Sequence, residues 1–210
     1  MKTLNELTRR LFELHYQNNQ CHLSSSLSLL QPLWEIYQRI EKPKIVLSYA
    51  HAAYAWYIIL EHLKLWSIPH PAPIHPPKSL IGYTAGSLGH GLPIALGMAL
   101  AKPNEKIHCF VSDGELAEGS MAEAYNIFKK YSVHNLNIYQ IYNGMSGNNE
   151  LFSANNYIKL DQYADFLSMT PAIFNAGYIY ETYPFLKPID AHYYKLTKED
   201  MEWINIRLAE

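Results

Sequence analysis

Two polar corners in the sequence follow short apolar runs that are typical of β-strands. Asp113 comes just after residues 107–111, and Asn143 comes just after residues 136–142. Residues 120–131 between them have apolar side chains at helical spacing, which predicts a strand–helix–strand unit. Such a unit has parallel strands and a right-handed crossover. We therefore expect Asp113 and Asn143 to emerge side by side at the carboxyl ends of neighbouring strands, where open α/β sheets bind ligands.

The residue types at these corners suit a hard metal ion and a phosphate group. Asp113 offers a carboxylate, Asn143 a carboxamide oxygen and Met145 a main-chain carbonyl. Oxygen ligands of this kind suit Mg²⁺, which usually keeps coordination positions for phosphate. Gly114 lets a diphosphate approach the backbone closely, because glycine has no side chain. The alternative is an ordinary strand-to-helix turn, in which aspartate and glycine are common.

The rest of the chain alternates strands with helices, which predicts an α/β protein. Helices are expected at 3–17, from 24 onward, and at 52–65, 92–101, 120–131, 161–167 and 197–208; strands are expected at 44–48, 107–111, 136–142 and 178–180. The proline-rich segment 69–77 predicts an extended loop. A glycine-rich turn is expected at 83–91, and a polar loop at 147–156. The length of 210 residues fits one domain with a proper core.

Composition argues against several classes of function. The net charge is −2 and no basic stripe is present, which argues against nucleic acid as a partner. No apolar stretch approaches the 18 residues of a membrane span. The N-terminus lacks the apolar core of a signal peptide, so we expect a cytoplasmic protein. Seventeen tyrosines and four tryptophans are a heavy aromatic load, which favours a subunit interface and an oligomer.

The two corners and three further motifs together resemble the transketolase family of thiamine-diphosphate enzymes. That family's cofactor signature is Gly-Asp-Gly followed by an asparagine roughly thirty positions on. This chain has Ser112-Asp113-Gly114 and then Asn143-Gly144. The resemblance is to the N-terminal, diphosphate-binding half of the family and covers about residues 20–150. It is strongest to split transketolases, in which this half is a separate polypeptide.

The resemblance implies a fold and a cofactor site. The fold is a three-layer αβα architecture with a doubly wound, mostly parallel sheet. It forms one diphosphate-binding domain over 1–210, truncated at the C-terminus relative to the family. Asp113, Asn143 and the carbonyl of Met145 are implied to bind Mg²⁺, while Gly114 is implied to contact the diphosphate of thiamine diphosphate.

Residues 84–91, Thr-Ala-Gly-Ser-Leu-Gly-His-Gly, resemble the family's Gly-Ser-Leu-Gly-His-Gly turn. Small residues there let the backbone of Gly86 and Leu88 approach a flat heterocycle or a phosphate. The alternative is a helix-capping loop without a ligand. For His90 we expect a packed or capping side chain rather than a chemical role.

Residues 21–28 resemble the family's Gly-His-x-Gly-x-Ser stretch, with serines in place of the usual glycines. By this resemblance His22 faces the substrate and Ser25 lies near the cofactor diphosphate. A capped helix that carries an exposed histidine is the alternative.

Residues 47–52 match the family's Leu-Ser-Lys-Gly-His-Ala, which ends a strand and starts a helix. His51 is thereby implied to lie beside the diphosphate at a helix N-terminus, a place that favours anions. The family's lysine and glycine are Tyr49 and Ala50 here, so one cationic contact is missing.

Three further features of the sequence have weaker counterparts in the family. His75 is a candidate for the histidine that contacts sugar hydroxyls, and His70 competes for that part. Glu118 stands where the family keeps a glutamate at its dimer interface, which communicates with a catalytic glutamate of the partner domain; helix capping is the alternative. Asp190-Ala191-His192 resembles a late Asp-Gly-His of the family and is expected to turn into the final helix.

The resemblance also implies that this chain needs a partner. Thiamine diphosphate is a carbanion sink whose activation requires a glutamate from a pyrimidine-binding domain. We expect that domain to be a separate subunit, and the pair to transfer a ketol unit between sugars or sugar phosphates.

Two other functions remain open at this stage. One is a degenerate relative with a non-catalytic binding or assembly role, which the lost glycines and lysine favour. The other is a related thiamine enzyme, such as a 2-oxo-acid dehydrogenase component or a deoxyxylulose-phosphate synthase. The Gly-Ser-Leu-Gly-His-Gly pattern within 84–91 argues against both of these enzymes.

Overall fold

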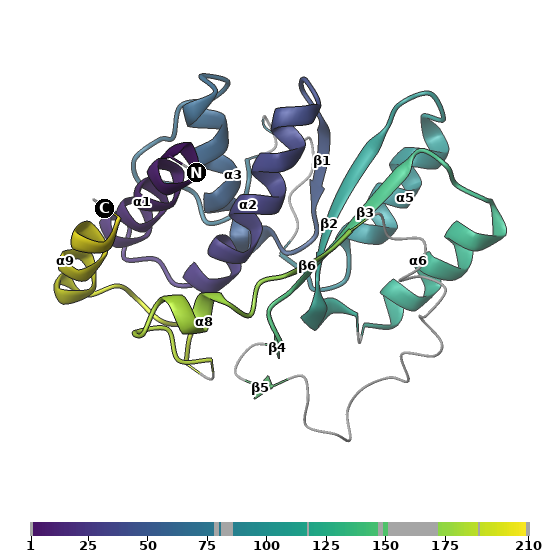
Figure 1. The fold of residues 1–210 in the computed structure, drawn as a ribbon. Coiled ribbons are helices and arrows are strands. Elements are labelled where there is room, and N and C mark those ends of the chain that lie inside the picture. Colours follow the sequence, from purple (N-terminus) through teal and green to yellow (C-terminus); the bar gives the residue numbers. More distant parts are fainter. Residues whose placement is uncertain are drawn as a thin grey trace.

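The computed structural model describes residues 2–77, 80, 86–116, 118–146, 149–150, 172–188 and 190–208. Within these residues the main sheet has the strands β1 (Lys44–Leu47), β2 (Ile107–Ser112), β3 (Leu136–Tyr142) and β6 (Ala172–Asn175). Their order is β1-β2-β3-β6, and every neighbouring pair is parallel. A short antiparallel pair, β4 (Met145–Ser146) and β5 (Asn149–Glu150), follows β3. The expected α/β fold with a parallel sheet is confirmed (Figure 1).

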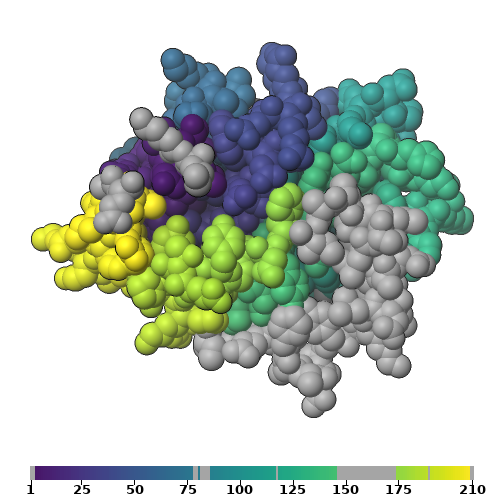
Figure 2. Space-filling model, viewed as in Figure 1, coloured from purple at the N-terminus to yellow at the C-terminus, as the bar shows by residue number. Residues whose placement is uncertain are grey.

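Helices cover both faces of the sheet, which gives the three-layer arrangement. On one side lie α1 (Lys2–Gln17), α2 (Leu23–Arg39), α3 (Ala53–His62), α8 (Ile179–Thr182) and α9 (Lys198–Arg207). On the other side lie α5 (Gly91–Ala101) and α6 (Gly119–Lys130). Helix α9 packs on α1, so the two ends of the chain lie close together (Figures 1 and 2).

The alternation of side chains along β1 and β2 explains the two cores. Leu47 and Phe110 belong to the hydrophobic cluster with α1 to α3, whereas Val46 and Cys109 belong to the cluster with α5 and α6. Successive side chains of a strand point to opposite faces, so a strand covered on both sides is apolar throughout. The buried thiol of Cys109 is a core residue, and burial raises its pKa well above the ordinary value.

Most expected elements are present, but the last strand lies elsewhere. The strand expected at 178–180 is wrong, because Tyr178 has helical backbone angles and α8 follows it. The strand that completes the sheet is β6, which pairs with Tyr139–Tyr142 of β3. The loop expected at 147–156 is wrong at Asn149–Glu150, which form β5. The helix expected at 161–167 lies outside the described residues.

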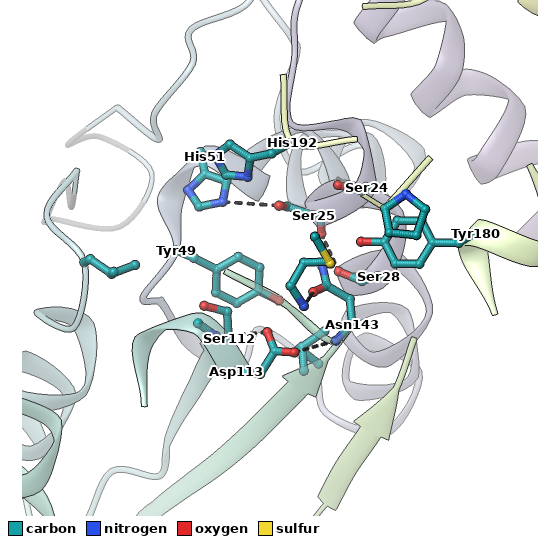
Figure 3. Close-up of a pocket in the computed structure, with 15 residues that line it drawn as sticks. Ser24, Ser25, Ser28, Tyr49, His51, Ser112, Asp113, Asn143, Tyr180 and His192 are labelled. Carbon is teal, nitrogen blue, oxygen red and sulfur yellow. Dashed lines mark hydrogen bonds between the residues drawn. The ribbon is translucent and has the colours of Figure 1, made fainter. Parts of the chain in front are cut away.

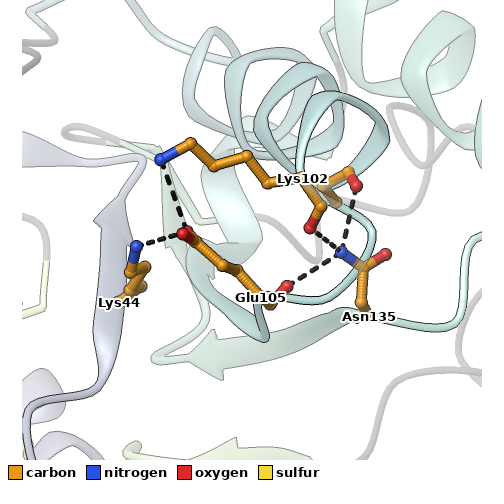
Figure 4. Close-up of polar contacts among 5 residues, drawn as sticks. Lys44, Lys102, Glu105 and Asn135 are labelled. Atoms are coloured by element: carbon orange, nitrogen blue, oxygen red, sulfur yellow. Dashed lines mark hydrogen bonds and ion pairs between the residues drawn. The ribbon is translucent and has the colours of Figure 1, made fainter.

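The ends of the sheet differ in chemistry. At the amino end, Lys44 and Lys102 both pair with Glu105, and the side-chain amide of Asn135 lies 2.8–3.0 Å from the carbonyl oxygens of Ala99, Lys102 and Glu105 (Figure 4). These ion pairs are exposed and contribute little to stability.

Within the described residues, no helix is long and apolar enough to cross a membrane.

At the carboxyl end, the Glu115 side chain joins three segments. It follows β2 in the short helix η2 (Asp113–Glu115) and is fully buried. Its Oε1 accepts hydrogen bonds from the Ser48 hydroxyl at 2.5 Å and the Gly89 N–H at 3.0 Å, and its Oε2 accepts from the Ser112 N–H at 2.9 Å. Burial raises the pKa of Glu115, whereas these hydrogen bonds oppose the rise. The carboxylate thereby ties β1, β2 and the glycine turn together.

Two glycines of the turn are required by this close approach. A Cβ at Gly91 would overlap the backbone of Ser48, and the Gly91 N–H donates to the Ser48 hydroxyl at 3.1 Å. Gly89 has a φ of +73°, and a Cβ there would lie 2.7 Å from Cβ of Glu118. Gly91 therefore lets the turn lie directly against the end of β1, and Gly89 lets it lie against the start of α6.

We predict that Gly91→Ala destabilises the fold by about 3 kcal/mol or more, because the added methyl group cannot be accommodated without moving backbone. Gly97→Ala is the matched control in the same helix α5, since its Cβ would meet no described atom within 4 Å. That control should stabilise the chain by about 0.5–1 kcal/mol. Urea unfolding measures both, and equal effects of the two substitutions would contradict the close approach.

Glu115→Gln should lower the free energy of unfolding by about 2–4 kcal/mol, because an amide N–H₂ would face hydrogen-bond donors inside the protein. Glu123→Gln, an exposed change on α6, should stay within about 0.5 kcal/mol of the wild type. Urea unfolding of the two variants compares them. A Glu115→Gln protein as stable as the control would mean that the carboxylate does not hold the three segments.

Candidate functional site

A cavity of about 350 Å³ opens at the carboxyl ends of β1, β2 and β3. Its described lining comes from the start of α2, the ends of β2 and β3, the segments after the strands, the glycine turn, α8 and the segment after α8. The lining residues are Ser24, Ser25, Ser28, Tyr49, His51, Leu88, Ser112, Asp113, Gly114, Ile141, Asn143, Met145, Tyr180, Pro188 and His192 (Figure 3). Ligands bind at this edge of open α/β sheets.

Asp113 lies at the floor of the cavity and is only 3 % exposed. Its Oδ2 accepts from the N–H groups of Asn143 at 2.9 Å and Gly144 at 2.7 Å, and its Oδ1 accepts from the Gly114 N–H at 3.0 Å. Burial raises the pKa of Asp113 to about 6, while these backbone hydrogen bonds oppose the rise. The structure thus brings the ends of β2 and β3 together through one carboxylate.

The side chain of Asn143 is held by its own turn. Its Oδ1 accepts from the Met145 N–H at 3.0 Å, and Gly144 between them has a φ of +82°. Among the described contacts, Oδ1 of Asp113 and Oδ1 of Asn143 each accept one N–H, so each oxygen keeps a lone pair. Two such oxygens on the wall of one cavity fit a hard cation such as Mg²⁺.

The glycine turn reaches the cavity at only part of its length. Leu88 lines the cavity, whereas Gly86 lies beside the ring of His75. A Cβ added at Gly86 would be 3.8 Å from Nε2 of His75. Thr84 and Ala85 lie outside the described residues. His90 is exposed, and among the described contacts its side chain makes no capping hydrogen bond. The packed or capping role expected for His90 is therefore wrong.

Three histidines converge at the other end of the site. The ring centroids lie 4.7 Å apart for His22 and His51, 4.5 Å for His22 and His192, and 5.5 Å for His51 and His192. Nε2 of His51 lies 3.2 Å from the Ser25 hydroxyl. His22 precedes α2 in a left-handed conformation and is partly buried, so the expected alternative of an exposed histidine is wrong.

Burial keeps these imidazoles neutral at pH 7. It lowers the pKa of His51 to about 3 and that of His22 to about 4, and the neighbouring histidines add to both effects. Burial also lowers the pKa of His192. His75 lies close enough to His22 and His51 to act on their pKa values, whereas its competitor His70 is exposed.

Glu118 lies outside the cavity lining. It occupies the N-cap position of α6, as the capping alternative expected, but among the described residues its side chain forms no capping hydrogen bond. Its side chain instead lies against Gly89. Its communication with a partner domain stays a prediction.

Sequence reasoning missed several residues of the site. Glu115 could have been found, because Ser112 and Glu115 have the spacing of a capping box, and the structure contains that box. His192 was expected only as part of a turn, yet its carbonyl accepts from the His22 N–H at 3.0 Å and its ring lines the cavity. Tyr180 was expected in a strand at 178–180 but lies on α8 and lines the cavity. The sequence offers no signal for that position.

The low pKa of His51 predicts how stability depends on pH. The ordinary pKa of a histidine is about 6.5, so below that pH the unfolded chain takes up a proton that the folded chain refuses. The stability contributed by this histidine is complete above pH 6.5 and is lost as the pH falls toward 3. When the pH is lowered from 7 to 5, the free energy of unfolding should fall in both proteins. The fall should be smaller in His51→Gln than in wild type, by about 1–2 kcal/mol, because the variant lacks this histidine.

Urea titrations at both pH values measure this difference, with the exposed His134→Gln as control. Equal falls in wild type and His51→Gln would show that His51 binds its proton as readily in the folded chain as in the unfolded one.

Known proteins match this chain in sequence and in fold. The family described as thiamine pyrophosphate enzyme, C-terminal TPP binding domain, matches residues 62–173, more than half of the chain. One of the subunits of apulose-4-phosphate transketolase from Phocaeicola vulgatus is 31% identical over 154 residues, which cover 61% of this chain and 55% of that protein. Transketolase from Homo sapiens is 37% identical over 109 residues, 44% of this chain and 18% of the human protein.

Solved structures agree on the fold. Transketolase from Campylobacter jejuni superposes with a TM-score of 0.71 at 19% identity, over 100% of this chain and 43% of that chain. Transketolase from Leishmania mexicana gives 0.69 at 15% identity, over 100% and 41%. This chain spans about half the length of the curated relatives first compared. The residues that match the family include the glycine turn and the two polar corners at Asp113 and Asn143. The chain therefore belongs to the thiamine pyrophosphate enzymes, as a TPP-binding half of transketolase type.

Proposed function

We propose that this chain is the N-terminal, diphosphate-binding subunit of a two-part transketolase-like enzyme that transfers a two-carbon ketol unit between sugars. The observation that carries the proposal is the convergence of Asp113 and Asn143 on one cavity, with a lone pair free on an oxygen of each. An oxygen pair of this kind at the carboxyl edge of a parallel sheet suits a metal-bound diphosphate.

In this proposal the oxygen end of the cavity holds Mg²⁺ and the diphosphate of thiamine diphosphate. The side-chain oxygens of Asp113 and Asn143 and the carbonyl of Met145 would hold the ion. Gly114, which lines the cavity without a side chain, would face the diphosphate. The bound cofactor supplies a sink for the electrons of the carbon–carbon bond that breaks.

Other residues in the cavity wall and next to it would hold the rest of the cofactor and the sugar. Ser25 and His51 form a hydrogen-bonded pair on the cavity wall and would contact the diphosphate region. The glycine turn would cover that region at Leu88, which lines the cavity, and at Gly86, which lies beside His75. His22 and His75 would contact sugar hydroxyl groups. The neutral imidazole of His22 suits hydroxyl groups, because its ring offers one donor and one acceptor.

A second polypeptide completes the site in this proposal. The relative from Phocaeicola vulgatus is named as one subunit of its enzyme, which supports a partner for this chain. The partner would supply the glutamate that acts on the pyrimidine ring, and Glu118, which the described chain leaves outside the cavity, would lie toward that interface. A hetero-oligomer of the two subunits follows.

Titration calorimetry with thiamine diphosphate and Mg²⁺ tests the cofactor site. We expect binding by the chain, alone or mixed with a pyrimidine-domain subunit, and a loss of affinity on the order of 100-fold in Asp113→Asn and in Asn143→Ala, because each removes a metal ligand. Glu123→Gln should bind as wild type does.

Melting curves establish that each variant is folded. If wild type binds no cofactor with or without its partner, the enzyme proposal is wrong, and the non-catalytic alternative takes its place. Undiminished binding by folded Asp113→Asn and Asn143→Ala would mean that the ion is held by other groups.

A further inference from the structure

Three histidines from separate parts of the chain present ring nitrogens to one point. His22 precedes α2, His51 lies in the short helix η1 (Ala50–Ala52) after β1, and His192 lies between α8 and α9. One ring nitrogen of each lies within 4.8 Å of the corresponding nitrogens of the other two. The contact between the His22 N–H and the His192 carbonyl at 3.0 Å holds two of these segments together.

The surroundings favour an ion over a purely packed cluster. All three rings are partly buried, and Nδ1 of His22 is buried without a hydrogen-bond partner in the described part of the chain. A buried polar atom without a partner destabilises the fold, and a bound ligand would offset that cost. Neutral imidazole is the form of histidine that binds metal ions.

We propose that His22, His51 and His192 form a binding site for a divalent transition-metal ion of the Zn²⁺ class, separate from the hard-cation site at Asp113. Imidazole nitrogen suits Zn²⁺, Ni²⁺ and Cu²⁺, whereas carboxylate and carbonyl oxygens suit Mg²⁺. Three histidines with a fourth position left to water are an established ligand set for zinc.

The geometry is close to what such an ion requires. Zinc–nitrogen bonds of 2.0–2.1 Å in a tetrahedron place the ligand nitrogens about 3.3 Å apart. The rings must therefore close by at most about 1.5 Å from the separation of 4.8 Å, which side-chain rotation can provide.

Ser25 supplies the outer contact that a histidine ligand needs. Nε2 of His51 lies 3.2 Å from the Ser25 hydroxyl. With its proton on that nitrogen, His51 would donate to Ser25 and keep Nδ1 unprotonated for metal binding. Metal-binding histidines usually donate their second ring N–H to a nearby oxygen, which orients the ring.

An ion at this site would regulate the enzyme, a consequence that rests on the proposed function. His22 would contact both the ion and the substrate sugar, and His51 would contact both the ion and the diphosphate region of the cofactor. The ion and the substrate would then compete, and Zn²⁺ would inhibit turnover. Binding of the ion itself requires neither thiamine diphosphate nor a partner subunit.

Absorption spectroscopy with Co²⁺ as the probe tests the site on the full chain, prepared without a histidine tag and without cofactor. We expect one equivalent of Co²⁺ to give the intense visible bands of a four-coordinate ion, and Zn²⁺ but not excess Mg²⁺ to remove them. His192→Gln and His51→Gln should each weaken Co²⁺ binding by at least about 10-fold.

Two variants separate this site from other causes of binding. His134→Gln removes an exposed histidine elsewhere, and Asp113→Asn removes the hard-cation site; both should keep the wild-type spectrum. If the wild-type chain shows only the weak bands of six-coordinate Co²⁺, that result by itself overturns the proposal. So would a four-coordinate spectrum that persists in both His192→Gln and His51→Gln. A chain that binds no thiamine diphosphate would leave the expected Co²⁺ result unchanged, so the two proposals fail separately.

Discussion

The buried Glu115 carboxylate is the interaction on which the architecture of the site depends. It accepts hydrogen bonds from Ser48 after β1, from Ser112 at the end of β2 and from Gly89 in the glycine turn. A buried carboxylate without such donors would cost several kcal/mol, so the three segments and the charge stabilise one another only together. Asp113, two residues earlier, repeats the arrangement at the end of β3 through backbone N–H groups.

The cavity above these two carboxylates has ends of different chemistry. Oxygen atoms of Asp113 and Asn143 line one end, and the imidazoles of His51 and His192 line the other. Figure 3 shows Tyr49 between them. The first end suits a hard ion and phosphate, while the second suits hydroxyl groups or a softer ion. One cavity can therefore bind a phosphate-bound hard ion at one end and a group of different chemistry at the other.

Tyr49 changes the character of the site relative to the family that the sequence resembles, which has lysine at this position. Its ring is buried, and within the described residues its hydroxyl has no hydrogen-bond partner. Burial raises the pKa of Tyr49 well above the ordinary value, and Glu115 and Asp113 add to the rise. The hydroxyl is thus a neutral donor directed into a site where the family carries a positive charge.

The sequence by itself determined the strand–helix–strand unit and the meeting of Asp113 with Asn143, because apolar periodicity and the right-handed crossover are local properties. It also contained the Ser112–Glu115 capping spacing. Only the tertiary structure decided that His192 joins His22 and His51, because these segments lie far apart in the sequence. The Ser24 hydroxyl and the Ala191 carbonyl, which meet beside the histidines, are 167 positions apart. It also decided that β6 and not residues 178–180 completes the sheet, because pairing with β3 outweighs the weak strand preference of a short aromatic segment.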